Sequence, residues 1–131
     1  MKLSLLLLTV SLVVASHKIT AQTQPIGLNV LVGSWKIDMS PQDSTDENFA
    51  EMTILKVQDG RFKGEFYRKG VKIKDAQINT QLGVIYCALT SGDNSGTYNT
   101  AFYYKDGILH GSTHSLSRDF LAVWTATKTE E

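Results

Sequence analysis

The fold class is decided by residues 58–66, which read Gln58-Asp59-Gly60-Arg61-Phe62-Lys63-Gly64-Glu65-Phe66. The Asp-Gly pair predicts a tight hairpin turn, because glycine readily adopts the positive φ that such turns need. After the turn, apolar or small residues alternate with charged ones, which is the period of a half-buried strand. The same arrangement, an Asp-Gly turn with a second glycine four residues later, recurs over 106–111. We therefore expect an antiparallel all-β protein in which glycines inside strands mark a bend or a close approach.

Short segments rich in β-branched and aromatic residues follow one another along the chain, separated by turn signals. This pattern predicts an eight-stranded antiparallel up-and-down barrel. The expected strands are 32–39, 50–57, 61–68, 71–79, 84–90, 97–104, 108–114 and 119–127. Within 71–79 the alternation changes parity, which predicts a β-bulge near Asp75. Residues 84–90 and 121–123 are apolar on both faces, so we expect both faces of the sheet to be covered there.

The first 21 residues have the pattern of a secretory signal peptide. Lys2 precedes an apolar run over 3–14, and small residues follow at Ala15 and Ala21. The run is shorter than the about 20 apolar residues that a bilayer span needs. We expect cleavage after Ala21, or alternatively after Ala15, and one exported barrel domain over 22–131, periplasmic or secreted. No cysteine lies near either site, so no lipid or other membrane anchor is expected.

Composition narrows the class of partner. The chain has 13 basic and 13 acidic residues, and removal of Lys2 and Lys18 with the signal peptide leaves a net charge of −2. This balance argues against nucleic-acid binding, which requires a basic face. The single cysteine, Cys87, excludes a disulfide within the chain and a thiolate metal cluster. Because Cys87 lies in an apolar run, we expect a buried, inert thiol, and no cofactor or metal is predicted.

The sequence Gly33-Ser34-Trp35, at the start of the first expected strand, resembles the Gly-x-Trp signature of the calycin superfamily of lipocalins, fatty-acid-binding proteins and avidins. The runs 33–38, 52–54 and 60–66 are similar to the start of an avidin. The resemblance implies a small ligand-binding barrel in which Trp35 packs across the closed end. We expect Trp124 to be a second core tryptophan. Ile37 stands where avidin-like biotin sites have a polar Asn, so biotin binding is not expected.

The second half of the chain resembles short secreted bacterial proteins of unknown activity. The resemblance is carried by residues 78–80, 91–96, 113–115 and 118–121, together with Trp124. It implies a protein of the bacterial envelope and assigns no activity.

The loops of an up-and-down barrel gather alternately at its two ends. One expected end has the short turns 58–60, 80–83 and 105–107, and the other has 40–49, 69–70, 91–96 and 115–118. The second set includes the longest and most polar loops, and rigid barrels commonly bind ligands at such loops. We therefore expect a small or apolar ligand at this mouth.

The candidate ligand-binding residues lie on the mouth loops or on the strand ends beside them. They are Asp93, Asn94, Tyr98, His114, Ser115 and Arg118. The Arg118 guanidinium could clamp a carboxylate or phosphate that His114 and Ser115 also contact. Alternatively, Arg118 contacts Asp119 or a carbonyl and only orders its loop. The oxygens of 91–96 lack the spacing of an EF-hand calcium loop.

No catalytic residue is predicted, but two other functions stay open. His110 and His114 would lie about 13 Å apart on a strand, which is too far for one metal ion. The Ser, His and Asp residues of 112–119 lack a Gly-x-Ser-x-Gly nucleophile elbow. One alternative is nevertheless an enzyme that uses His114 and Arg118. The other is a structural or protein-interaction envelope module with a packed barrel, and the oligomeric state is open.

Overall fold

The computed structural model describes residues 27–129. The expected signal peptide and its two cleavage sites lie outside these residues. The described part consists of a 3-10 helix, η1 (Leu28–Leu31), followed by eight antiparallel strands. The strands are β1 (Gly33–Asp38), β2 (Phe49–Gln58), β3 (Arg61–Tyr67), β4 (Ile73–Asn79), β5 (Ile85–Asp93), β6 (Gly96–Lys105), β7 (Ile108–Ser115) and β8 (Phe120–Lys128). The predicted all-β, up-and-down fold is confirmed.

The predicted bulge in β4 is also confirmed. The register of β4 against β5 shifts between Ile73 and Asp75. However, β4 begins at Ile73 and not at Val71, because the chain still turns there and the Val71 N–H donates to the Arg68 carbonyl at 3.2 Å. A second register shift, which the sequence pattern did not predict, lies in the middle of β2.

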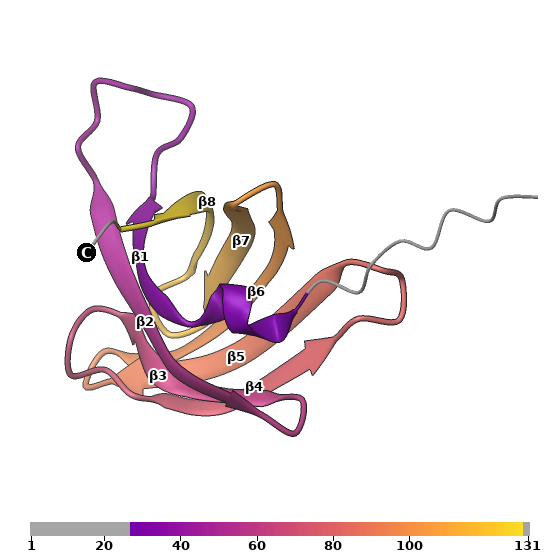
Figure 1. The fold of residues 1–131 in the computed structure, drawn as a ribbon. Coiled ribbons are helices and arrows are strands. Elements are labelled where there is room, and N and C mark those ends of the chain that lie inside the picture. Colours follow the sequence, from indigo (N-terminus) through magenta and orange to yellow (C-terminus); the bar gives the residue numbers. More distant parts are fainter. Residues whose placement is uncertain (1–26, 130–131) are drawn as a thin grey trace, which may run out of the picture.

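The strands form one sheet in the order β3-β2-β1-β8-β7-β6-β5-β4. The first and last strands pair antiparallel, with Trp35 opposite Lys128 and Asp38 opposite Thr125. The sheet curls until its edge strands β3 and β4 face each other (Figure 1). In place of a ladder, their backbones are joined by an isolated bridge between Glu65 and Lys72 and by a hydrogen bond from the Ile78 N–H to the Gly60 carbonyl. The barrel is therefore nearly closed, with a seam between β3 and β4.

Two glycines inside strands are required by close contacts. A Cβ at Gly64 would overlap the backbone carbonyl of Thr53 on β2, and a Cβ at Gly111 would overlap the Trp124 ring. The second glycine of each Asp-Gly pattern thus permits an approach that no other residue allows. The expectation that these glycines mark close approaches is confirmed, although the neighbour is backbone in one case and a ring in the other.

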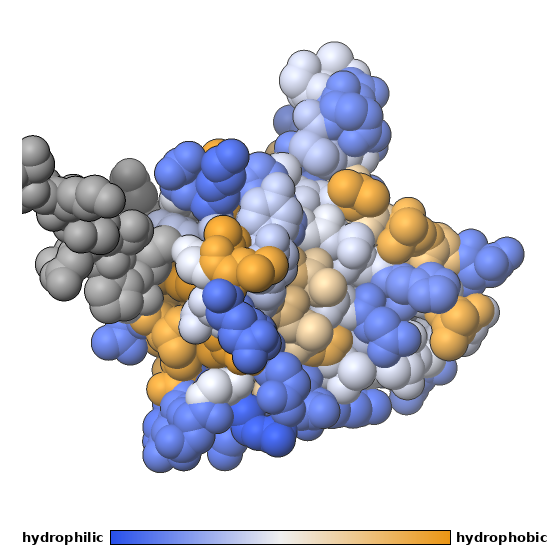
Figure 2. Space-filling model, turned by 90° about the vertical axis from the view of Figure 1, so that its right-hand side faces the viewer, coloured by the Kyte–Doolittle hydropathy of each residue, from blue (hydrophilic) through white to orange (hydrophobic). Residues whose placement is uncertain are grey.

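The helix η1 and the Trp35 side chain close one end of the barrel. The Trp35 indole N–H donates to the Leu31 carbonyl at 2.9 Å. The Lys128 ammonium lies 5.2 Å from the Trp35 ring centre and donates to the carbonyls of Val30 and Val32 at 2.7 and 2.8 Å. Figure 2 views the molecule from this end, where hydrophobic groups lie among hydrophilic ones. Because Lys128 satisfies carbonyls that would otherwise lack partners, it fixes η1 to the last strand.

The barrel interior changes from apolar to polar toward the other end. Trp124 is fully buried, packs against Phe66 and Phe102 with ring centres 6.0 and 6.1 Å apart, and donates to the Thr113 hydroxyl at 3.0 Å. Beyond it, Thr100 and Thr113 share a buried hydrogen bond of 3.0 Å. The interior thus becomes polar as it nears the loop-rich end.

The expectation that both faces of the sheet are covered at 84–90 and 121–123 is wrong. Leu121 and Val123 on β8 are 65% and 64% exposed, and Tyr86 on β5 is 43% exposed. These side chains occupy the outward positions of their strands. Val123 and Tyr86 belong to the β-branched and aromatic types that strands favour, so their apolar character does not require a second layer over that face.

Candidate functional site

Four connections meet at the end of the barrel opposite η1, and we call this end the mouth. They are residues 39–48, 68–72, 94–95 and 116–119. The longest, between β1 and β2, projects from the barrel as a hydrophilic lobe (Figures 1 and 2), and its residues 41–48 are all exposed. The base of this lobe is fixed, because the Ser40 hydroxyl donates to the Asp46 carboxylate at 2.6 Å.

A cavity of about 370 Å³ opens at the mouth. Its walls come from strands β2, β3, β6, β7 and β8, from the two ends of the connection between β1 and β2, and from the loop before β8. The lining includes Phe49, Phe66, Tyr67, Tyr98, Arg118 and Phe120. The volume lies at the lower end of the range of about 300–1,000 Å³ that is usual for small-molecule sites.

Aromatic rings form much of the cavity wall. Tyr67 and Tyr98 meet edge to face with ring centres 5.2 Å apart, and Tyr98 lies 6.3 Å from Phe120. Tyr98 is buried because it occupies an inward position on β6. Aromatic walls of this kind bind planar or apolar groups through contact area and ring geometry.

Arg118 brings a positive charge to this wall. Its guanidinium donates to the Tyr98 hydroxyl at 3.3 Å and lies 5.3 Å from the Phe120 ring centre. Its backbone N–H donates to the buried Ser115 hydroxyl at 3.2 Å, which fixes the loop. The hydrogen bond to Tyr98 raises the pKa of Arg118, so the guanidinium stays charged.

A second arginine at the mouth is already neutralised. Asp93 accepts hydrogen bonds from the Tyr67 hydroxyl at 2.7 Å and from Arg68 at 3.5 Å. The hydrogen bond from Tyr67 lowers the pKa of Asp93, and the same bond raises the pKa of Tyr67. The two ion pairs among residues 27–129 are Arg68–Asp93 and Arg61–Asp75. Arg118 therefore has no carboxylate partner in the described part of the chain.

The structure brings together four of the six predicted site residues. Tyr98 and Arg118 line the cavity, Ser115 holds the loop beneath Arg118, and Asp93 orients Tyr67. His114 does not join them, because it occupies an exposed, outward position on β7 between the buried Thr113 and Ser115.

Asn94 is exposed in the turn between β5 and β6 and lines a separate depression with Arg68 and Gly70. The residues predicted from the sequence as the calycin-like signature lie elsewhere. Trp35 is at the closed end, Trp124 is in the core, and Gly33 has a φ of 135° at the start of β1. None of these three belongs to the cavity wall.

Sequence reasoning did not identify Tyr67 and Phe120 as site residues. Strict alternation along β3 places Phe66 inside and Tyr67 outside, yet both line the cavity at the end of the strand. The available signal was the pairing of an aromatic residue with an arginine on two mouth loops, Tyr67-Arg68 and Arg118 with Phe120. An arginine close to an aromatic residue in sequence is a possible cation–π pair, in which the guanidinium lies over the ring.

Within 27–129 no group of three His, Cys, Asp or Glu residues is arranged to hold a metal ion. Cys87 is buried, as expected, and burial raises the pKa of its thiol to about 12. In the part of the chain that the structure describes, no helix is long and apolar enough to cross a membrane.

Comparison with protein-family models, with curated proteins and with solved structures gave no match.

Proposed function

We propose that the chain is an exported, calycin-like barrel that binds a small anionic ligand at its mouth. The observation that carries this proposal is the Arg118 guanidinium, which lies on an aromatic wall without a carboxylate partner among residues 27–129. A guanidinium binds carboxylate or phosphate groups through paired N–H donors. The Tyr98 and Tyr67 hydroxyls lie beside the same wall.

The cavity also limits the rest of the ligand. About 370 Å³ accommodates a compact molecule. The rings of Phe49, Phe66 and Phe120 favour a planar or apolar body. The calycin-like character is supported by the closed end, where Trp35 packs beneath η1 and Lys128 lies over its ring.

Matched probes test the proposal directly. Indole-3-carboxylate and its neutral carboxamide have the same ring and differ in charge, and their binding can be compared by isothermal titration calorimetry. We expect the carboxylate to bind at least tenfold more tightly than the amide. Arg118→Gln should remove this preference, whereas Arg61→Gln, which changes an exposed arginine outside the mouth, should keep it.

Native mass spectrometry of protein purified from its own cells provides a second readout. A retained small anion that is lost in Arg118→Gln would support the proposal. The proposal would be overturned if the anionic probes fail to bind and no ligand is retained, or if the amide binds as well as the carboxylate.

A further inference from the structure

The seam between β3 and β4 differs from every other strand junction of the barrel. Seven neighbouring pairs form antiparallel ladders, two of which contain a register shift. Across the seam, Ile78 donates to the Gly60 carbonyl at 2.8 Å, Phe66 donates to the Val71 carbonyl at 2.9 Å, and Glu65 and Lys72 form one isolated bridge. Between the Ile78–Gly60 and the Phe66–Val71 hydrogen bonds the two strands form no ladder, so their edges face each other without regular pairing.

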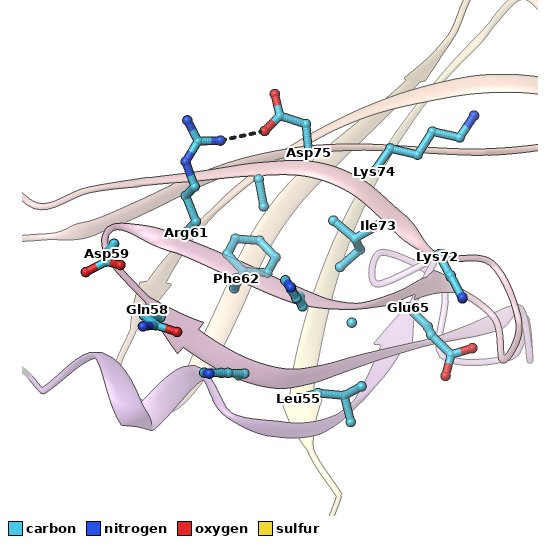
Figure 3. Close-up of a pocket in the computed structure, with 14 residues that line it drawn as sticks. Leu55, Gln58, Asp59, Arg61, Phe62, Glu65, Lys72, Ile73, Lys74 and Asp75 are labelled. Carbon is cyan, nitrogen blue, oxygen red and sulfur yellow. Dashed lines mark hydrogen bonds and ion pairs between the residues drawn. The ribbon is translucent and has the colours of Figure 1, made fainter.

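A hollow of about 600 Å³ lies along this seam, on the outer side of the barrel. Figure 3 shows Phe62 and Ile73 between the two strands, with charged side chains around them. Phe62 and Ala76 are buried and form an apolar floor. The hollow is thus a slot with an apolar floor and a charged rim, which extends from the two edges onto the adjoining part of β2 and is larger than the mouth cavity.

The rim of the slot is predominantly basic. It has five basic residues, Lys56, Arg61, Lys63, Lys72 and Lys74, and three acidic ones, Asp59, Glu65 and Asp75. Arg61 is paired with Asp75 at 3.1 Å (Figure 3), and Glu65 accepts a hydrogen bond from the Gly70 N–H. Within residues 27–129 no ion pair is formed by the lysines, including the exposed Lys63 and Lys72.

Both strand edges point backbone N–H and C=O groups toward the slot. In an antiparallel strand, alternate residues direct both N–H and C=O to the same side. The backbone N–H groups of Phe66 and Ile78 donate across the seam. Phe62 on β3 and Ala76 on β4 are an even number of residues away from them, so their backbone N–H and C=O groups also point toward the seam. An exposed strand edge with free N–H and C=O groups is a template for another strand.

We propose that this seam binds an extended, acidic segment of a partner protein as an added β-strand. Main-chain hydrogen bonds to the two edges would supply affinity, as in other strand-addition sites. Side chains of a strand alternate between two faces, so one set would contact the floor at Phe62 and the other set would lie beside Lys63 and Lys72. The preferred segment therefore alternates apolar and acidic residues.

The lysines also explain which strands the seam rejects. Charged side chains on an edge prevent indiscriminate pairing with neutral strands, and a basic segment would be repelled. Two backbone hydrogen bonds and an ion pair whose side chains are 62% and 60% exposed join the strands across the seam, so parting it breaks fewer hydrogen bonds than parting a full ladder.

Fluorescence anisotropy with a labelled heptapeptide that alternates Val and Glu tests this proposal on the full chain. We expect this peptide to bind at least tenfold more tightly than its Val and Lys counterpart. N-methylation of alternate peptide nitrogens should abolish binding, because it removes the donors that a ladder requires. The Lys63→Glu, Lys72→Glu double variant should lose at least tenfold in affinity for the acidic peptide and bind the basic one better.

The double variant Lys36→Glu, Lys105→Glu makes the same change in charge on exposed positions of β1 and β6, and it should bind like the parent. Circular dichroism and thermal melting confirm that each variant is folded. Equal binding of the N-methylated peptide, equal binding of the basic peptide, or no binding at all would overturn the proposal. The proposal would also be overturned if light scattering shows that the chain forms a dimer and that the Lys63→Glu, Lys72→Glu variant does not. In that case a second copy of the chain would occupy the seam.

Discussion

Gly111 lies directly against the Trp124 ring, so even one added methyl group is excluded there. We expect Gly111→Ala to lower the free energy of unfolding by about 2 kcal/mol or more, because the ring must move out of its packed position between Phe66 and Phe102. Urea unfolding followed by far-UV circular dichroism measures this loss.

Gly27→Ala is the matched control, because nothing lies within 4 Å of a Cβ at Gly27. This substitution should change the free energy of unfolding by less than about 0.5 kcal/mol. If both variants have the same stability, the close packing of Trp124 against β7 would be contradicted.

Cys87 provides a prediction about pH. Burial raises the pKa of its thiol from 9.0 to about 12, so the folded state keeps the proton that the unfolded chain releases. The contribution of this thiol to the free energy of unfolding is therefore constant below pH 9, and the folded state loses stability relative to the unfolded chain as the pH rises from 9 toward 12. Between pH 9 and 10.5, we expect the parent to lose stability relative to Cys87→Ala by up to about 1.4 kcal/mol per pH unit.

Urea titrations of the two proteins at several pH values measure this difference, and tyrosine and lysine titrations cancel in the comparison. A maleimide should also label Cys87 at pH 8 in urea but not in buffer. Rapid labelling of the native protein would show that the thiol is accessible, against its burial in the structure.

At the scale of the element, each strand separates two environments. Leu109 on β7 is fully buried, whereas Leu121 on β8 is 65% exposed. We expect Leu109→Gln to cost about 3 kcal/mol or more, because an amide would enter an apolar core without a partner. Leu121→Gln should cost less than about 0.5 kcal/mol. Chemical denaturation of both variants checks the comparison, and similar losses would mean that the outer face of β8 is covered.

The elements could be predicted from the sequence because their signals are local. The Asp-Gly turns and the alternation after them locate β2, β3, β6 and β7 to within a few residues, and the parity change locates the bulge beside Asp75. Covering of the outer face could not be predicted. An apolar run on both faces is compatible with a buried strand and with an exposed one, and only the packing of other elements distinguishes the two.

The site could be predicted in part for a similar reason. The up-and-down order placed the loops of Tyr98 and Arg118 at one end, and the structure brings their side chains within 3.3 Å. His114 was included because it lies at a strand end beside the mouth, where it could contact the same anion as Arg118 and Ser115, but neighbours on a strand point to opposite faces. Tyr67 was missed because strand alternation places it on the outer face, whereas it lines the cavity. It is the last residue of β3, and the alternation of side chains no longer predicts their direction where a strand ends.

At the scale of the whole molecule, the barrel has one well-closed junction and one open junction. The β1–β8 pair joins the first and last strands through four residue pairs, and Lys128 adds hydrogen bonds to η1 and to the residue after it. The β3–β4 seam has one isolated bridge and two backbone hydrogen bonds. The mouth cavity and the slot along the seam both involve β3 but share no lining residue, so the proposed ligand and peptide sites can be changed independently through Arg118 and through Lys63 with Lys72.

This unequal closure predicts where the molecule opens first. Strands β6 and β7 have continuous ladders on both sides, whereas β3 and β4 each have one. Backbone amides of Phe62 and Ala76, which face the seam without a ladder partner, should therefore exchange at least tenfold faster than those of Phe102 and Leu109, which require near-global unfolding. Native-state hydrogen exchange followed by NMR measures these rates. The acidic heptapeptide should slow exchange at the seam and leave β6 and β7 unchanged, whereas uniform protection of all eight strands would contradict a seam that opens.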